Sequence, residues 1–242
     1  MAQSISQEKG RLYFAYGSNL STAQMRDRCP NSTPIGLAHL TGWTWIINER
    51  GYANVVQNGY KSSPQPRDTE DHDEVNEGYD SSWDQPWETA SGPGVYGLVY
   101  RLHPDDEEEL DRREGVGYAY EREVLDLVWA DVSDSNTGQD SLPIATGFSP
   151  KTEPNQPTEE TEKQIHEETA SLVPGENFQA LVYVDFQRIT PSNAKNEYVG
   201  RMNVGIKETS EQWGLPLAYV TEVIRPYIPA PSNASRAAAT NE

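Results

Sequence analysis

Residues 12–16 form an apolar, aromatic-rich run that stops abruptly at Gly17-Ser18-Asn19. Such a run is typical of a buried strand, and the small and polar residues after it are typical of a tight turn. Gly17 allows another group to approach the backbone closely. The amides that follow can then hold an anion or a developing oxyanion, or the turn can simply end the strand.

A second chemical signal stands about a hundred residues later, at Glu114-Gly115-Val116. The preceding segment starts with His103-Pro104 and continues with acidic residues, a pattern that predicts the first turn of a helix. Glu114 then falls at the helix C-terminus, where the helix dipole disfavours its negative charge, and Gly115 can supply a left-handed cap. A carboxyl in that position is a candidate general base, or one more surface glutamate of an acidic helix.

The acidity of the chain is concentrated in two segments. Of a net charge of −19, residues 61–90 carry −7 and residues 131–177 carry −8. An acidic chain of this kind is a poor match for the nucleic-acid backbone, so we expect no nucleic-acid partner. Because both segments are rich in Pro, Ser and Gly and lack periodicity, we predict long acidic loop insertions at 60–93 and 131–177.

Cysteine and histidine usage limits the chemistry further. The single cysteine, Cys29, cannot form an intramolecular disulfide, which favours a reducing compartment. It is either a small buried thiol or a nucleophile, and no histidine lies near it in sequence to activate it. The four histidines are scattered without a ligand pattern, so we expect no metal. The first ten residues lack a signal-peptide core and no run has transmembrane length, so we expect a cytoplasmic protein with no membrane partner.

The ordered part of the chain is predicted to be one domain at 11–229, with a disordered N-terminus at 1–10 and a disordered tail at 230–242. Apolar periodicity and turn residues predict strands and helices within it. Ser21 is a plausible helix N-cap. Spacing places Leu125, Leu127 and Trp129 on one face of a strand, and Tyr198, Met202 and Ile206 on one face of a helix. The expected strands lie at 11–16, 42–47, 52–56, 95–102, 120–129 and 178–186, and the expected helices at 21–28, 104–114, 193–213 and 216–224. We therefore predict an α+β fold, with a small mixed β-barrel or bent sheet and flanking helices.

The two motifs together resemble the signature sequences of the γ-glutamylcyclotransferase family. One is the run from Leu12 to Leu20, and the other spans Leu110 to Val116. A strand-like segment at 94–100 and the later Tyr198 fit the same family pattern. The resemblance touches roughly half of the chain, and the ordered occurrence of both motifs is far more specific than either alone. The two acidic insertions depart from the compact family pattern.

The resemblance implies an intramolecular cyclisation in which the α-amine of a γ-glutamyl group attacks its own γ-carbonyl and releases 5-oxoproline. Glu114 matches the family's catalytic acid/base. Tyr198 matches a substrate-binding tyrosine, or it is a half-buried helix aromatic. The matched substrate loop comprises Tyr13, Phe14, Ala15, Tyr16, Gly17, Ser18 and Asn19. The reaction requires no cofactor, since the nucleophile is already part of the substrate.

Alternatives remain open at this level. The same chemistry could serve glutathione conjugates of secondary metabolites or γ-glutamylamines. A relative that keeps the pocket could instead be a non-catalytic γ-glutamyl-binding module, although retention of Glu114 favours catalysis. The expected partner is a small-molecule γ-glutamyl substrate, and the sequence leaves a homodimer open.

Overall fold

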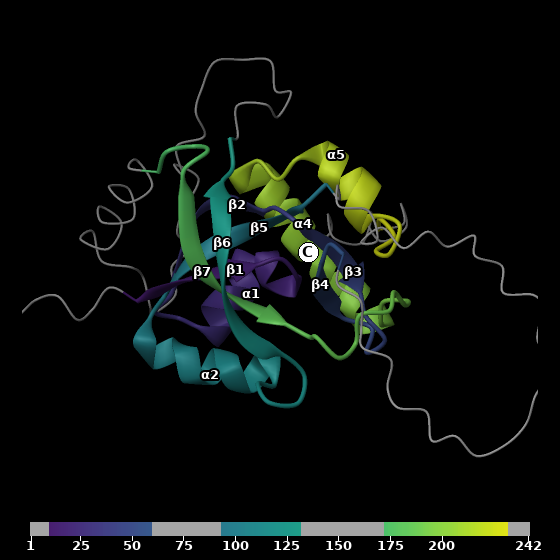
Figure 1. Ribbon diagram of the computed structural model, residues 1–242, viewed down its shortest axis with the longest axis horizontal. Helices are drawn as coiled ribbons and strands as arrows, with labels where there is room; N and C mark the ends of the chain where they lie inside the picture. The colour runs from purple at the N-terminus through teal and green to yellow at the C-terminus, as the bar shows by residue number, and fades with distance from the viewer. Residues whose placement is uncertain (1–9, 60–92, 132–171, 232–242) are drawn as a thin grey trace, which may run out of the picture.

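The computed structural model describes residues 10–59, 93–131 and 172–231 (Figure 1). Most of each predicted acidic insertion and most of both predicted disordered ends lie outside these residues. The two acidic segments at 61–90 and 131–177 therefore lie largely outside the described residues as well.

Five strands form a closed barrel in the order β1-β5-β2-β6-β7. Strand β1 (Arg11–Ala15) pairs antiparallel with β5 (Val95–Leu102) and parallel with β7 (Asn177–Val184), which closes the barrel. Strand β6 (Glu121–Trp129) pairs antiparallel with both β7 and β2. The predicted mixed β-barrel is confirmed, because the barrel contains both parallel and antiparallel pairs.

Strand β2 (Thr33–Leu40) is a barrel strand that the sequence analysis did not predict. Pro34 and Gly36 obscure its pattern, because both residue types are depleted in strand interiors. The pairing of β2 with β5 shifts register between these two residues, which marks a β-bulge. The strand is nevertheless fixed by pairing along its length with β5, a tertiary contact that no local pattern reveals.

A separate hairpin lies beside the barrel and consists of β3 (Trp43–Ile47) and β4 (Ala53–Gln57). All five residues of β3 are buried. Figure 1 shows this hairpin next to helix α4 (Asn196–Trp213), on the side of the barrel away from β7. The mostly apolar character of residues 43–47 thus reflects burial on both faces.

Short helical segments join these strands. The turn after β1 is a 3₁₀ segment, η1 (Ser18–Leu20), and helix α1 (Thr22–Arg28) follows it. The predicted cap is confirmed, because the Ser21 side chain accepts a hydrogen bond of 3.1 Å from Gln24 N. The last segment starts as α5 (Leu217–Tyr219) and continues as a π-helical turn, η4 (Val220–Ile224), where a regular helix was predicted.

One hydrophobic core links barrel, hairpin and helices. The predicted two-residue period of β6 is confirmed, since Leu127 and Trp129 are buried while Val124 on the other face is 58 % exposed. The predicted face of α4 is also buried, through Tyr198, Met202 and Ile206. None of the helices within the described ranges has the length and apolarity needed to cross a membrane.

Candidate active site

Helix α2 (Pro104–Glu114) is anchored at its N-terminal end by a buried carboxylate. Asp106 is 4 % exposed and accepts hydrogen bonds from Asn31 N at 2.9 Å, Asn31 Nδ2 at 3.0 Å and Ser32 Oγ at 2.8 Å. The fully buried Leu110 fixes the middle of the helix against the core. With both contacts in place, the C-terminal residue of the helix has a defined position relative to the barrel.

That C-terminal residue is Glu114, and Gly115 ends the helix as predicted. Gly115 has φ +68° and ψ +47°, which is the left-handed conformation that glycine adopts without a Cβ penalty. The Gly115 N–H donates to Arg112 O at 3.2 Å and the Val116 N–H donates to Asp111 O at 3.0 Å. This pair of bonds is the Schellman motif, so the orientation of Glu114 at the helix end is fixed by the backbone itself.

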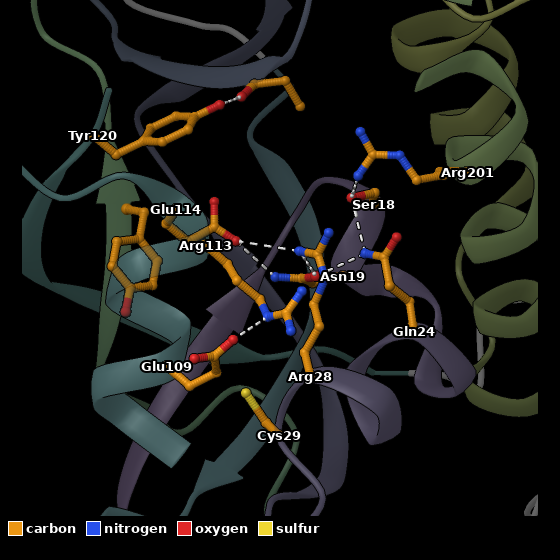
Figure 2. Close-up of polar contacts among 12 residues, drawn as sticks. Ser18, Asn19, Gln24, Arg28, Cys29, Glu109, Arg113, Glu114, Tyr120 and Arg201 are labelled. Carbon is orange, nitrogen blue, oxygen red and sulfur yellow. Dashed lines mark hydrogen bonds and ion pairs between the residues drawn. The ribbon is translucent and has the colours of Figure 1, made fainter. Parts of the chain in front are cut away.

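Asn19 connects the end of α2 to the turn after β1 (Figure 2). Its Nδ2 donates to Glu114 Oε1 and to the Tyr13 hydroxyl, both at 2.9 Å. Its Oδ1 accepts from Gln24 Nε2 at 2.8 Å and from Arg28 Nη1 at 3.0 Å. Four partners leave the amide a single orientation, and that orientation presents a donor to Glu114.

The Glu114 carboxyl has a raised pKa. Burial is the largest cause, because it disfavours the charged form. The cations Arg28, Arg201 and Arg50 and the hydrogen bond from Asn19 all lower the pKa, but burial outweighs them. Arg28 Nη1 lies 3.9 Å from Glu114 Oε1, and the Glu114 side chain keeps 18 % exposure. The site therefore holds a carboxyl that accepts a proton more readily than an ordinary glutamate and still reaches solvent.

The turn after β1 contacts the hydroxyl of Tyr198, which helix α4 carries. Ser18 N donates to Tyr198 Oη at 3.2 Å, and Ala53 N donates to the same oxygen at 3.3 Å. A Cβ at position 17 would lie 2.8 Å from that oxygen, so only glycine fits the approach. Tyr198 is 4 % exposed, so it is buried and not half-buried, and its hydroxyl reaches the turn.

Tyrosines surround the carboxyl, and their hydroxyls have defined partners. Tyr16 donates to Tyr183 O at 2.5 Å, Tyr120 donates to Ala53 O at 2.7 Å, and Tyr183 donates to Asp111 Oδ1 at 2.7 Å. Burial raises the pKa of each of these tyrosines above its ordinary value. These tyrosines therefore stay neutral in the physiological range.

Gln24, Arg28 and Arg201 belong to the site but were not predicted from the sequence, and the same is true of Tyr120 and Tyr183. Gln24 Nε2 donates to Ser18 Oγ at 3.0 Å, and Arg201 Nη1 donates to the same oxygen at 3.3 Å (Figure 2). Arg28 holds the Asn19 amide from helix α1. Arg201 had a usable signal, since it follows Tyr198 by three residues and therefore shares its helix face.

Not every predicted substrate-loop side chain lies at the site. Phe14 is fully buried and Ala15 is 1 % exposed, and both belong to the hydrophobic core. Cys29 is also fully buried, and burial raises the pKa of its thiol to about 12. Cys29 is therefore a buried thiol and not an activated nucleophile. Within the described ranges, no three His, Cys, Asp or Glu side chains are grouped in a way that could hold a metal ion.

Known proteins were compared with the chain by sequence and by structure. No protein-family model matches the chain, and no curated protein matches it by sequence. A solved gamma-glutamyl cyclotransferase superposes with a TM-score of 0.52 at 16 % identity, covering 96 % of this chain and 99 % of that one. An uncharacterized protein from Homo sapiens gives a TM-score of 0.52 at 16 % identity, covering 97 % of this chain and 100 % of that one.

YkqA from Bacillus subtilis gives a TM-score of 0.50 at 15 % identity, covering 94 % of this chain and 57 % of that one. At these identities the likeness concerns the fold alone. The chain is similar in fold to a gamma-glutamyl cyclotransferase over nearly its whole length.

Proposed function

We propose that this chain, which has a γ-glutamylcyclotransferase-like fold, is a cyclotransferase that releases 5-oxoproline from γ-glutamyl amino acids or peptides. The observation that carries the proposal is the Glu114 carboxyl, whose pKa is raised by burial and which Asn19 holds at 2.9 Å. The same asparagine is part of the Gly17–Leu20 turn, whose backbone would face the γ-glutamyl group. One residue thus couples the acid/base to the substrate loop.

The reaction needs a proton acceptor and then a proton donor. Glu114 takes a proton from the α-ammonium of the substrate, and the free amine attacks the γ-carbonyl carbon. A bond forms between the α-nitrogen and that carbon, and the amide bond to the leaving amine breaks. As the ring closes, the attacking nitrogen loses its second proton to solvent, and Glu114 returns the first proton to the leaving nitrogen, so the products are 5-oxoproline, a neutral amine and one proton. A pKa raised above that of an ordinary glutamate suits a group that must both take and return a proton.

Backbone N–H groups of the turn would stabilise the developing oxyanion. Ser18 N, one of the donors expected from the sequence, donates to the Tyr198 hydroxyl. The N–H groups of Gly17 and Asn19 belong to the same turn, on either side of Ser18. We assign the oxyanion to these two amides, with Tyr198 fixing the turn that carries them. Donors held in place before the reaction are worth about 3–4 kcal/mol each in the barrier.

A product assay tests the proposal. The panel contains γ-Glu-Ala, glutathione, γ-Glu-lysine and a bulky glutathione S-conjugate, and the readout is 5-oxoproline. Glu114→Gln keeps the size of the side chain and is expected to lower kcat by about 100- to 10,000-fold. The matched control is Glu109→Gln. Glu109 lies on the same helix, but its Oε1 pairs with Arg113 Nε at a distance of 2.6 Å and it is not bonded to Asn19 (Figure 2). Wild-type turnover by Glu114→Gln, or silence across the panel from a folded protein, would refute the proposal.

A further inference from the structure

Arg50 lies in the tight turn that joins β3 to β4, and the local backbone holds it firmly. Arg50 N donates to Asn48 Oδ1 at 3.1 Å, and Gly51 N donates to Asn48 O at 2.8 Å. Gly51 has φ +82° and accepts a hydrogen bond of 3.2 Å from Lys195 N. Because helix α4 begins directly after Lys195, the turn that carries Arg50 is tied to the same helix that carries Tyr198.

The Arg50 guanidinium contacts two aromatic rings, and its side chain keeps 27 % exposure. Its Cζ lies 5.2 Å from the centre of the Tyr120 ring and 5.6 Å from that of Tyr52. Its Nη1 is buried and has no hydrogen-bond acceptor among the described residues. The closest ion pair of Arg50 in that part of the chain, with Asp185 Oδ2, spans 3.9 Å. A buried donor without an acceptor is rare in proteins and often marks a functional position.

Asp185 does not neutralise Arg50, because it already serves other donors. Arg188 Nη1 donates to Asp185 Oδ2 at 3.0 Å, and Asn48 Nδ2 donates to the same oxygen at 3.1 Å. One carboxylate thus faces two guanidinium groups, which leaves a positive charge in excess. Arg201, which lies over the Tyr198 ring, differs in this respect because it pairs with Glu197 at 3.0 Å.

Arg50 borders the candidate active site through its two aromatic neighbours. The Tyr120 hydroxyl donates to Ala53 O, and Ala53 N donates to Tyr198 Oη. The Tyr52 ring meets the Tyr198 ring edge-on, with 5.2 Å between centroids. The charge of Arg50 also lowers the pKa of Glu114 against the effect of burial. Arg50 therefore lies within electrostatic reach of the carboxyl that performs the proposed acid/base step.

We propose that Arg50 binds the α-carboxylate of the γ-glutamyl substrate and of the 5-oxoproline product, an inference that rests on the proposed function. A guanidinium matches a carboxylate with two parallel charge-assisted hydrogen bonds. Contact with the Tyr52 and Tyr120 rings holds the guanidinium in place before the ligand arrives, which reduces the entropy lost on binding.

The placement also serves the chemistry. The α-carboxylate and the α-amine share one carbon, so anchoring the first fixes the second. A cation beside the α-ammonium disfavours its charge and promotes release of the proton to Glu114. The structure thus assigns recognition of the glutamyl end to Arg50 and proton transfer to Glu114.

The test compares two substrates and three variants. The substrates are γ-Glu-Ala and its analogue with an α-carboxamide in place of the α-carboxylate. Arg50→Met is expected to lower kcat/KM for γ-Glu-Ala by about 10- to 100-fold and to leave the value for the carboxamide unchanged within about threefold. Arg50→Lys keeps the charge and should recover part of the loss. The control is Arg112→Met, which removes a 66 % exposed arginine from helix α2 and should affect neither substrate.

Binding of 5-oxoproline, measured by calorimetry on the full chain, separates this inference from the proposed function. Weaker binding to Arg50→Met by about the same factor supports the carboxylate site, even if no γ-glutamyl compound is turned over. Equal losses on both substrates in a folded Arg50→Met variant would overturn the assignment, since the carboxamide lacks the proposed contact. Unchanged kinetics and unchanged binding would overturn it as well.

Discussion

Replacing Asn19 by leucine tests how the structure sets the pKa of Glu114. Asn19 is 4 % exposed, and leucine has nearly the same size but no donor. The substitution removes the 2.9 Å hydrogen bond to Glu114 Oε1. A hydrogen bond to a charged group is worth about 1.5–3 kcal/mol. Because one pKa unit equals about 1.4 kcal/mol, loss of the bond should raise the pKa of Glu114 by about 1–2 units.

The pKa of Glu114 should rise because the hydrogen bond that is lost stabilises the charged form of the carboxyl. The ionised form of Glu114 becomes less favourable. The acidic limb of the profile of kcat/KM against pH should therefore move to higher pH. A carboxyl-carbon NMR titration of Glu114 should move in the same direction, and it does not require turnover. A smaller folded fraction lowers the height of the profile but leaves the pH at the midpoint of its acidic limb unchanged. A shift of that midpoint therefore reports the pKa and not the stability of the variant.

The control for this experiment is Asn58→Leu. Asn58 accepts a hydrogen bond of 2.7 Å from Thr44 Oγ1 beside the hairpin and is not bonded to Glu114. Its profile should match that of the wild type. If Asn19→Leu folds and both the kinetic limb and the NMR midpoint stay in place, the hydrogen bond does not tune Glu114 and the reasoning above is refuted.

Two further predictions follow from the site. Glu114→Gln should raise the free energy of unfolding near neutral pH and have little effect near pH 4. The reason is that the pKa of Glu114 is raised in the folded state, so the wild type loses stability as the pH rises through that pKa. Urea titrations at several pH values check this, and equal stability of variant and wild type at every pH would contradict it. Gly17→Ala should lower the free energy of unfolding by about 1–2 kcal/mol and impair turnover, because the new Cβ would lie 2.8 Å from Tyr198 Oη and displace the hydrogen bonds of that hydroxyl. Urea titration and the 5-oxoproline assay check this, and a variant as stable and active as the wild type would contradict it.

Much of the fold follows from local sequence. The cap at Ser21, the start of α2 at Pro104 and its end at Gly115 are all set by residues within a few positions of each other. The buried face of β6 follows from alternation alone. These predictions succeeded because the energy that decides them is local or because burial imposes a simple period.

Other features depend on partners that are distant in sequence. Strand β2 contains Pro34 and Gly36, and only its ladder with β5 reveals it as a strand. The contact between Asn19 and Glu114 spans 95 positions, and that between Ser18 and Tyr198 spans 180. The family resemblance identified both motifs. It did not predict that Asn19 of the first motif donates a hydrogen bond to Glu114 of the second.

The cations of the site illustrate the same limit. Arg28 and Arg50 stand in segments with no chemical motif, and each acquires its role from the side chains around it in three dimensions. Charge alone does not single them out, because the chain contains 19 Lys and Arg residues. The missing hydrogen-bond acceptor of Arg50 Nη1 within the described structure is a property of the fold that no sequence pattern encodes.

The central claim is that Glu114 drives cyclisation and not hydrolysis. The most direct measurement is the identity of the product formed from γ-Glu-Ala in water labelled with heavy oxygen, for the wild type and for Glu114→Gln. The account predicts unlabelled 5-oxoproline from the wild type, no free glutamate, and almost no product from Glu114→Gln. Labelled glutamate as the first product would show that water, and not the α-amine, attacks the γ-carbonyl, and the mechanism derived from this site would be wrong.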